Sequence, residues 1–488
     1  MVHASSMSAA PEQPLARLRP CLLVAIAAQL LMLLASLRHH YVWGESASMP
    51  WLLPLLNTGE AFAVVLAAAL GAFAWWRAMP KVEAAAPSLR QLLWFSLPLL
   101  LAAVVVPPFL TADPIDYVVR GRVLAVHGAN PYVTVATDFP GDPFLAFGDR
   151  AWKGFPLPYG PVLANVQGAA AWLAHLLPLP PRGELIAALL LLKLLFGGAL
   201  LLAATSLARF VGATAGPAAA ARTFVAIAWN PLLLAEGVAN AHNDPLLAAC
   251  LAIAVLGAQR GQFARSTLAL GVGVLTKVTP LVAVPLLAMQ ALVRRQLRGL
   301  VLGGLAVLAL AALFYLQFFR VDGAFDVMRR QGELHGASLA WALHEVTGAP
   351  IATFVTVGRV FVVLVVAVAM LRLWRERGTA TVDHLPHTFA AALAALACCG
   401  AGLFGVWYHF WWIPLALLGR GTWLARFAVA ASCTSLLAYV PWTFARRLDA
   451  PAQWANVFAA VLLPFALAFL GGRRGERSTA AGSVPSVP

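Results

Sequence analysis

Long uninterrupted apolar stretches dominate the chain, and their lengths indicate helices that cross a membrane. A helix needs about 20 apolar residues to cross a hydrocarbon core of about 30 Å. Stretches of this kind fall at 21–37, 52–76, 92–110, 185–207, 299–319, 351–371, 387–405, 424–444 and 453–471. Helices are expected for all of them, because an open strand would leave backbone polar groups unpaired in lipid. The pattern therefore predicts an all-α, polytopic transmembrane bundle.

Shorter or interrupted apolar stretches carry most of the polar residues and predict broken helices. They lie at 162–177, 223–238, 244–258, 266–293 and 409–419. Together with the long stretches they predict roughly 12–14 membrane segments, some short or re-entrant. We expect 266–293 to form a hairpin of two short helices broken at 276–280, and 162–177 to be interfacial or re-entrant.

The positions of Lys and Arg predict which loops face the cytoplasm, because short loops on that side are rich in them. Such loops occur at 77–90, 209–222, 259–265, 294–298, 372–377 and 420–426. The two long loops, 111–161 and 320–350, then face outward. We expect a cytoplasmic segment at 1–20, one transmembrane domain at 21–471 with these outer loops, and a disordered cytoplasmic tail at 472–488.

Composition excludes a soluble protein, since 61% of the 488 residues are hydrophobic and only 11% are charged. The formal net charge of +14 does not indicate a nucleic-acid partner, because the basic residues lie between apolar stretches as topology signals do. The five cysteines lie inside apolar stretches, without the spacing of a metal site or a disulfide framework. Membrane lipids are the expected surroundings.

The first outer loop begins with two carboxylates, Asp113 and Asp116, at the end of an apolar stretch. A carboxylate at the membrane surface can accept the proton of a hydroxyl that attacks an anomeric carbon. An alternative is that Asp113 only caps a helix whose first residue is Pro114. The two roles are compatible, and Asp116, one turn later, competes with Asp113 for the role of base.

Several motifs along the chain, in their order and spacing, resemble those of bacterial polyprenol-phosphate-mannose-dependent mannosyltransferases of the GT-C type. In the outer loop they are Asp113-x-x-x-Tyr117-x-x-x-Gly121-Arg122-x-Leu124, Gly128-x-Asn130-Pro131-Tyr132 and Pro158-Tyr159-Gly160-Pro161. Further along they are Trp229-Asn230-Pro231-Leu232-Leu233, Ala241-His242-Asn243-Asp244, Lys277-Val278-Thr279-Pro280 and Trp407-Tyr408 followed by Trp412-x-Pro414-Leu415. The resemblance extends over roughly residues 100 to 420. Relatives have Gly where this chain has Ala241.

The resemblance implies a glycosyltransferase in a bacterial inner membrane that moves a sugar, with mannose the best candidate, from a polyprenyl-phosphate donor. The acceptor would be a lipid or glycan on the extracytoplasmic face, and the anomeric carbon would be inverted. By position the catalytic residue is Asp113. The expected substrate-binding residues are Asp116, Tyr117, Arg122, Tyr132, Tyr159, His242, Asn243, Asp244, Lys277, Trp407 and His409.

Some of these residues also have an interpretation from their own chemistry. Lys277 lies at the predicted break of a hairpin, where an ionisable group in lipid indicates function and suits a phosphate, or it extends to the interface. His242, Asn243 and Asp244 lie at an outward turn, where they could recognise sugar or cap a helix. The aromatic cluster that contains Trp407 and His409 is typical of an interfacial belt, although an imidazole there can donate a hydrogen bond.

Two buried charges, Glu236 and Lys193, could pair with one another or with substrate. No cofactor is expected. Carboxylates near Asp113 could bind a divalent metal, but no spacing of His and Asp residues requires one.

Two other functions compete with the glycosyltransferase. A transporter or flippase of a lipid-linked substrate would also have broken helices and buried charges, but the sequence shows no duplicated halves. A polymerase or ligase of preformed glycans differs only in its donor, and the order of the motifs argues against it. The sequence has no Asp-x-Asp pair for a nucleotide-sugar and no phosphate-binding Gly-rich loop, which favours a lipid-linked donor.

Overall fold

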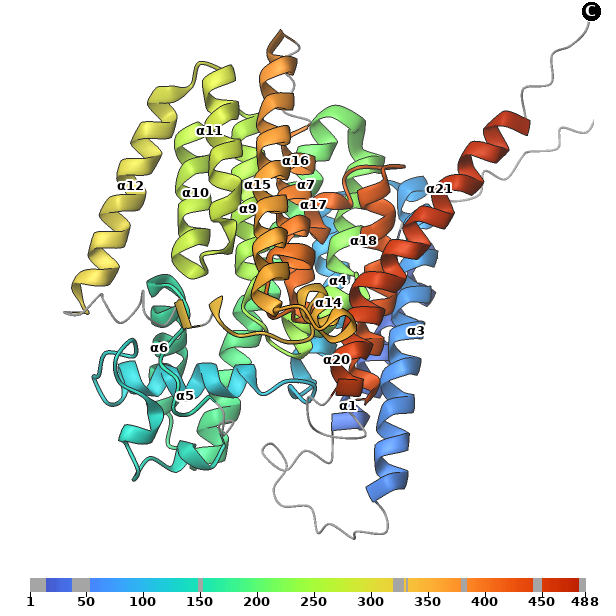
Figure 1. Cartoon of the computed structure of the whole chain (residues 1–488). Coiled ribbons are helices and arrows are strands. Elements are labelled where there is room, and N and C mark those ends of the chain that lie inside the picture. The colour runs from blue at the N-terminus through green and yellow to red at the C-terminus, as the bar shows by residue number, and fades with distance from the viewer. Residues whose placement is uncertain are drawn as a thin grey trace, which may run out of the picture.

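The computed structural model describes residues 15–36, 53–147, 152–318, 329–330, 332–378, 384–441 and 450–481. Within these residues the chain is a bundle of helices, and its only β-type pairing is one parallel bridge between Gly336 and Leu403 (Figure 1). The prediction of an all-α, polytopic bundle is confirmed.

In the described part of the chain, seven helical segments are long and apolar enough to cross a membrane. They are formed by α1 (Arg19–Ser36), α3 (Leu53–Ala85), α7 (Pro181–Ala228), α12 (Leu297–Leu316), α15 (Ile351–Arg375), α18 (Trp423–Thr434) with the turn that follows it, and α20 (Ala450–Val457) with α21 (Leu463–Ala481). Shorter apolar helices complete the bundle: α4 (Leu89–Val105), α9 (Asp244–Gln259), α10 (Phe263–Thr276), α11 (Val284–Val293) with the 3-10 turn before it, and α16 (Leu385–Ala395) with the π-turn after it.

Two of the expected spans are shorter than the apolar stretches that predicted them. In the stretch 92–110 the helix α4 ends at Val105. Val106 has extended backbone, the conformation favoured for a residue that precedes a proline, and Pro107 and Pro108 follow it. The stretch 387–405 forms α16, which passes into a π-turn at Leu396–Gly400 and ends there. Hydropathy alone overestimated both helices, since it does not register these interruptions.

Helix α7 bends at Gly216, whose φ of 81° suits glycine, and continues at Pro217. The bend lies inside the segment 209–222 that was expected to be a loop between spans. The second arm ends at Ala228. Two residues later, the side-chain oxygen of Asn230 accepts hydrogen bonds from the N–H groups of Leu232 and Leu233 at 3.1 and 3.2 Å. This cap begins the short helix α8 (Pro231–Leu234).

The predicted hairpin at 266–293 is confirmed. Helix α10 ends at Thr276, Lys277 has extended backbone, and a 3-10 turn at Thr279–Ala283 leads into α11. In Figure 1 the break points toward the same end of the bundle as α5 and α6.

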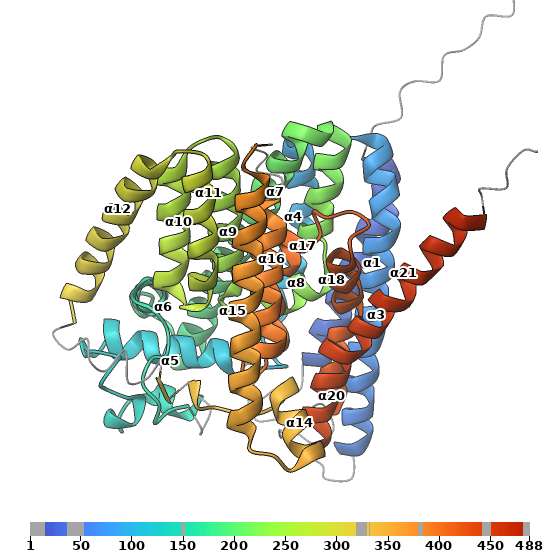
Figure 2. The same cartoon turned by 45° about the horizontal axis from the view of Figure 1, so that its top comes forward.

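Helices α5 (Asp113–Ala125) and α6 (Pro161–His175) pack together at one end of the bundle, as Figures 1 and 2 show. The packing is close: a Cβ atom on Gly121 would lie 2.3 Å from the carbonyl oxygen of Gln167. Helix α6 has 15 residues and a length of about 22 Å, too short to cross the hydrocarbon core. Its expected interfacial or re-entrant placement stays a prediction.

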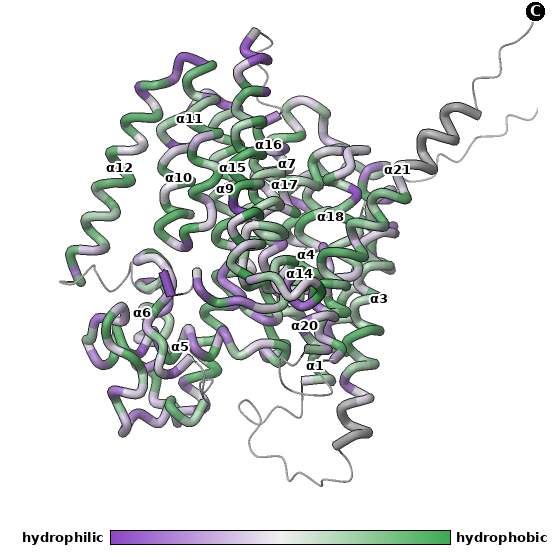
Figure 3. Tube along the Cα trace, viewed as in Figure 1, coloured by the Kyte–Doolittle hydropathy of each residue, from purple (hydrophilic) through white to green (hydrophobic). Residues whose placement is uncertain are grey.

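The core divides into a large membrane bundle and a smaller cluster under the first outer loop. The smaller cluster joins α5, α6 and the start of α7 through Tyr117, Tyr132, Tyr159 and Phe196. Hydrophilic residues gather around this end of the molecule, whereas the long helices are mostly hydrophobic (Figure 3). Of the second outer loop, the structure describes 329–330 and 332–350, which include α14 (Leu339–Thr347).

The predicted boundary at 471 falls inside α21, which continues to Ala481, so the first part of the expected disordered tail is helical. Residues 482–488 of that tail, and the start of the expected segment 1–20, lie outside the described residues. The division into a cytoplasmic segment, one transmembrane domain and a tail stays a prediction.

Candidate active site

Segments far apart in the sequence meet where the outer-loop cluster joins the bundle. They are the start of α5, the turn between the π-helix Ala235–Ala239 and α9, the break at Lys277, and the 3-10 helix η8 (Val406–Trp411). Single π-turns inside helices are frequent at functional sites. The contacts among these segments define a candidate active site.

Asp113 is the first residue of α5, and its side chain does not cap the helix. Ala112 occupies the cap position, and Pro114 follows within the first turn. The backbone N–H of Asp113 donates to the hydroxyl of Thr111 at 3.2 Å. The interpretation of Asp113 as a helix cap is therefore wrong, and its carboxylate, with 24% of the side chain exposed, is available for other chemistry.

His242 lies between Asp113 and Glu236. Its Nδ1 is 3.1 Å from Oε2 of Glu236, and its Nε2 is 3.9 Å from Oδ2 of Asp113. The imidazole stacks on Trp407, with ring centres 4.1 Å apart and an interplanar angle of 14°. The buried Nε2 has no hydrogen-bond partner, so the ring is fixed on one side and turns its other nitrogen toward Asp113.

Charge favours the protonated form of His242. Burial alone would lower its pKa, but the hydrogen bond and negative charge of Glu236, with contributions from Asp113 and Asp244, raise the pKa above its ordinary value. Glu236 is itself fully buried and accepts from the hydroxyl of Tyr439 at 3.0 Å. These contacts hold a cation beside Asp113.

The turn before α9 contains a residue with an uncommon backbone conformation. Ala241 has a φ of +51°, a conformation that glycine adopts without strain and that costs other residues about 1–2 kcal/mol. The turn nevertheless brings His242, Asn243 and Asp244 into the site, and all three are fully buried.

Asp244 and Lys277 form a buried ion pair. The Nζ atom of Lys277 donates to Oδ1 of Asp244 at 2.9 Å, and the indole N–H of Trp411 donates to the same oxygen at 2.7 Å. The ammonium also lies 5.2 to 5.8 Å from the ring centres of Tyr159, Tyr408 and Trp411. Since an ammonium has three N–H donors, Lys277 keeps donors for a ligand.

The outer loop is fastened to the site by two tyrosines and a glycine. Asn243 donates to the hydroxyl of Tyr117 at 2.9 Å. The rings of Tyr117 and Tyr159 pack edge to face, with their centres 5.7 Å apart. Burial is the largest cause that raises the pKa of both tyrosines, so both stay neutral. The N–H of Gly160 donates to the carbonyl of Thr276 at 3.0 Å. This contact holds the loop against the break of the hairpin.

Arg122 was expected to bind substrate, but the structure places it in an ion-pair cluster under the loop. Its Nε donates to Asp142 at 3.1 Å, it pairs with Glu184, and its guanidinium lies 3.9 Å over Phe144. Burial alone would raise the pKa of Asp142, but hydrogen bonds from the Phe144 N–H, His127 and Arg122 lower it overall. Arg122 therefore stabilises the loop.

Three further residues, Tyr132, His409 and Lys193, bond backbone carbonyl groups of the protein. The hydroxyl of Tyr132 donates to the carbonyl of Tyr159 at 3.0 Å, and His409 is fully buried with Nε2 3.0 Å from the carbonyl of Ala460. The possible pairing of Lys193 with Glu236 is wrong, because Lys193 donates to the carbonyls of Val104, at 2.9 Å, and Val106. These groups support the fold around the site.

Arg120 was not singled out by the sequence, although the structure gives it unused donors. The residue is 8% exposed, and its Nε and Nη2 have no hydrogen-bond partner. Its positive charge acts on the hydroxyl of Tyr159. The spacing of seven residues from Asp113 places both on one helical face, a signal that could have selected Arg120 instead of Arg122.

Asp116, the competitor of Asp113 for the role of base, is 2% exposed, so Asp113 is the more accessible of the two. Within the described residues, no three His, Cys, Asp or Glu side chains are grouped to hold a metal ion.

Comparison with known proteins identifies a family. Residues 22–293 match the family model described as alpha-(1->6)-mannopyranosyltransferase, N-terminal domain. The matched region contains Asp113, His242, Asp244 and Lys277, while Trp407 lies beyond it. No curated protein matches the chain.

Proposed function

The chain belongs to the alpha-(1->6)-mannopyranosyltransferase family, whose model covers more than half of it, and from this premise we propose its donor, face and chemistry. The protein is a membrane glycosyltransferase of the mannosyltransferase type. It transfers mannose from a polyprenyl-phosphate donor to a lipid or glycan acceptor, with no cofactor. The positions of Lys and Arg support a multi-pass orientation in a bacterial inner membrane with the site on the extracytoplasmic face.

The single observation that carries the proposal is the exposure of Asp113 among buried partners. Its side chain is 24% exposed, whereas Glu236 and Asp244 are fully buried and engaged with His242 and Lys277. A general base must reach a substrate hydroxyl. Asp113 is therefore the base, and the other two carboxylates hold the cations of the site in place.

The proposed step is a direct displacement at the anomeric carbon of the donor sugar. The acceptor oxygen attacks the anomeric carbon, and its proton passes to the carboxylate of Asp113. The bond from that carbon to the phosphate oxygen breaks, and its electron pair leaves with polyprenyl phosphate. Attack opposite the leaving group inverts the anomeric carbon.

Two cations are placed to stabilise the charge that develops on the phosphate. Lys277 has donors beyond the one that bonds Asp244, and Arg120 has two guanidinium nitrogens without a partner. Arginine forms bidentate hydrogen bonds to phosphate. We assign both residues to the donor phosphate.

Transfer of radiolabelled mannose from synthetic polyprenyl-phosphate-mannose to membrane lipids and glycans tests the proposal. We expect the wild type to incorporate label and Asp113→Asn to lose about 10²–10⁴-fold in rate, the typical contribution of a general base. Binding of the donor should remain. Asp116→Asn is the matched control, because it removes a neighbouring carboxylate of the same loop.

Normal transfer by Asp113→Asn would contradict its role as base. If the wild type transfers none of several polyprenyl-phosphate sugars to any membrane fraction, the donor is wrong. In that case uptake or flipping of the same lipids by reconstituted protein becomes the function to measure.

A further inference from the structure

A cavity lies far from Asp113, between the C-terminal half of α3, the second arm of α7, the segment from α17 (Ile413–Ala416) into α18, and α21. Its volume is about 920 Å³, within the usual range for ligand sites. The C-terminal end of α3 and the bend of α7 lie at the end of the bundle opposite α5 (Figures 1 and 2). This is the end that the positions of Lys and Arg assign to the cytoplasm.

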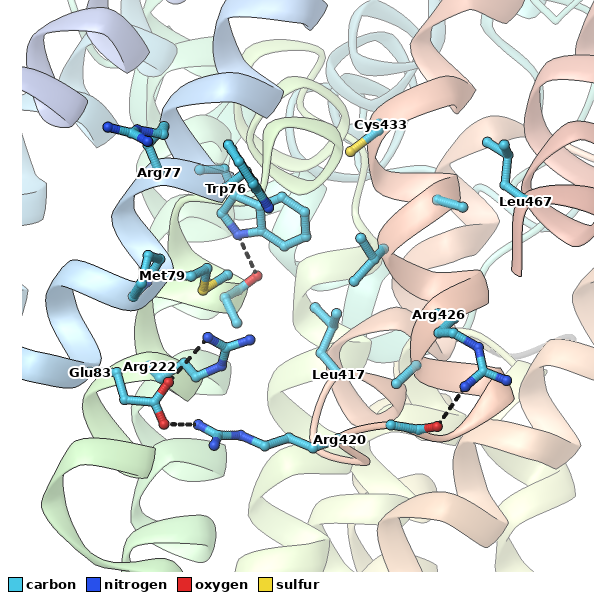
Figure 4. A pocket seen from close by; sticks show the side chains of 17 residues that line it. Trp76, Arg77, Met79, Glu83, Arg222, Leu417, Arg420, Arg426, Cys433 and Leu467 are labelled. Carbon is cyan, nitrogen blue, oxygen red and sulfur yellow. Dashed lines mark hydrogen bonds and ion pairs between the residues drawn. The ribbon is translucent and has the colours of Figure 1, made fainter. Parts of the chain in front are cut away.

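One end of the cavity carries more positive than negative charge. Figure 4 shows Glu83 bonded to both Arg222 and Arg420, at 3.2 and 2.5 Å. Arg426 donates to the carbonyls of Gly421 and Ala468, which do not neutralise it. Two arginines thus share one carboxylate, and the third, Arg426, has no carboxylate partner among the contacts described.

These arginines remain accessible. The side chains of Arg222 and Arg420 are 36% and 55% exposed. Guanidinium groups that are already held in place lose little freedom when they bind a phosphate.

The rest of the cavity is apolar, and part of its lining continues onto the outer surface of the bundle. Trp76, Val429 and Leu467 line it and are 65%, 43% and 45% exposed. Trp75 is buried, and its indole N–H donates to the carbonyl of Ala226 at 3.1 Å, so this polar group is satisfied. Hydrocarbon chains can therefore enter from the side.

We propose that this cavity binds one anionic phospholipid of the surrounding membrane, with its phosphate on Arg222, Arg420 and Arg426 and its acyl chains along Trp76, Val429 and Leu467. Charge complementarity and the amphiphilic lining select this occupant. A free phosphate would use only the arginines, and a zwitterionic lipid would not match their excess charge. Basic pockets between membrane helices on the cytoplasmic side bind anionic head groups in this way.

The site is separate from the donor phosphate proposed at Lys277 and Arg120, and it does not depend on the proposed function. Binding at the cavity is measured without any transfer reaction. A loss of transfer in Asp113→Asn would leave lipid binding unchanged.

Binding of dioleoylphosphatidylglycerol to the delipidated full chain in detergent, followed by native mass spectrometry, tests the proposal. We expect saturable binding of one molecule and weaker binding of dioleoylphosphatidylcholine, which has the same acyl chains. The double variant Arg222→Gln/Arg420→Gln should weaken binding of the anionic lipid about 25-fold, or about fivefold per arginine. Arg298→Gln, which removes an exposed charge from the first turn of α12, outside the cavity, should bind as the wild type does.

A second variant, Ala430→Trp, places a large side chain in the apolar part and keeps every charge, so it should also weaken binding. It tests the proposal even if loss of the arginines prevents folding. Equal binding of the two lipids, or undiminished binding by both variants, would overturn the proposal. Competition by inorganic phosphate as strong as by the lipid would identify a free-phosphate site instead and would also overturn it.

Discussion

The pair of Asp244 and Lys277 permits a quantitative prediction about a charge buried in a membrane bundle. Asp244→Ala removes a carboxylate that is fully buried, and it leaves Lys277, 11% exposed, without its counter-ion. It also leaves the indole N–H of Trp411 without its acceptor. Breaking a buried pair by removal of one partner costs about 3–5 kcal/mol. We expect a loss of that size in the free energy of unfolding.

Burial is the cause of this cost, and an exposed ion pair of the same chain serves as the control. Arg329 and Glu333 form an ion pair with the same N–O distance, 2.9 Å, but their side chains are 64% and 61% exposed. An exposed pair contributes at most about 1 kcal/mol. Glu333→Ala should therefore have a small effect.

Reversible unfolding in mixed micelles of mild detergent and SDS, followed by tryptophan fluorescence, measures both variants. The double variant Asp244→Ala/Lys277→Met should recover part of the loss, because it removes the charge that Asp244→Ala strands. If Asp244→Ala costs no more than Glu333→Ala, or if the double variant is less stable than Asp244→Ala, the reasoning is wrong.

Further predictions concern the outer loop. Arg122→Gln should destabilise the protein by up to about 3–5 kcal/mol, since it removes the cation that the carboxylates of Asp142 and Glu184 share. Arg120→Gln should fold normally and lower kcat/KM about 10–100-fold through lost phosphate contacts. Unfolding and transfer assays together distinguish the two variants, and the reverse pattern would contradict the assignment. Because the folded-state pKa of Asp142 is lowered, its stabilisation is present above its unfolded pKa of about 3.9 and is lost as pH falls through the folded pKa. Asp142→Asn should therefore flatten the acid side of a stability profile, and an unchanged slope would refute this. Gly160→Ala should destabilise the loop and lower transfer, because its Cβ would lie 2.1 Å from the backbone oxygen of Leu275; a variant as stable and active as wild type would show that the loop can move away.

The sequence alone predicted the bundle, because hydrophobic length and backbone pairing in lipid leave helices as the only open choice. It also predicted the break at Lys277, since proline and a charge interrupt an apolar stretch there. Hydropathy could not show that α4 ends at Val105 or that α7 bends at Gly216 within one long helix. Those features depend on single backbone positions that an average over a window does not register.

For the site, the sequence singled out Asp113, His242, Asp244 and Lys277 chiefly because they stand in motifs that resemble those of mannosyltransferases. Lys277 also stood out as a charge at the break of an apolar stretch. It could not decide which charges meet, since ion pairs join residues that are far apart in the chain. Packing placed Arg122 among carboxylates under the loop and left Arg120, two residues earlier, with unused donors. Only the tertiary structure decides this. Side chains two positions apart on a helix point in directions that differ by about 200°, so they contact different neighbours.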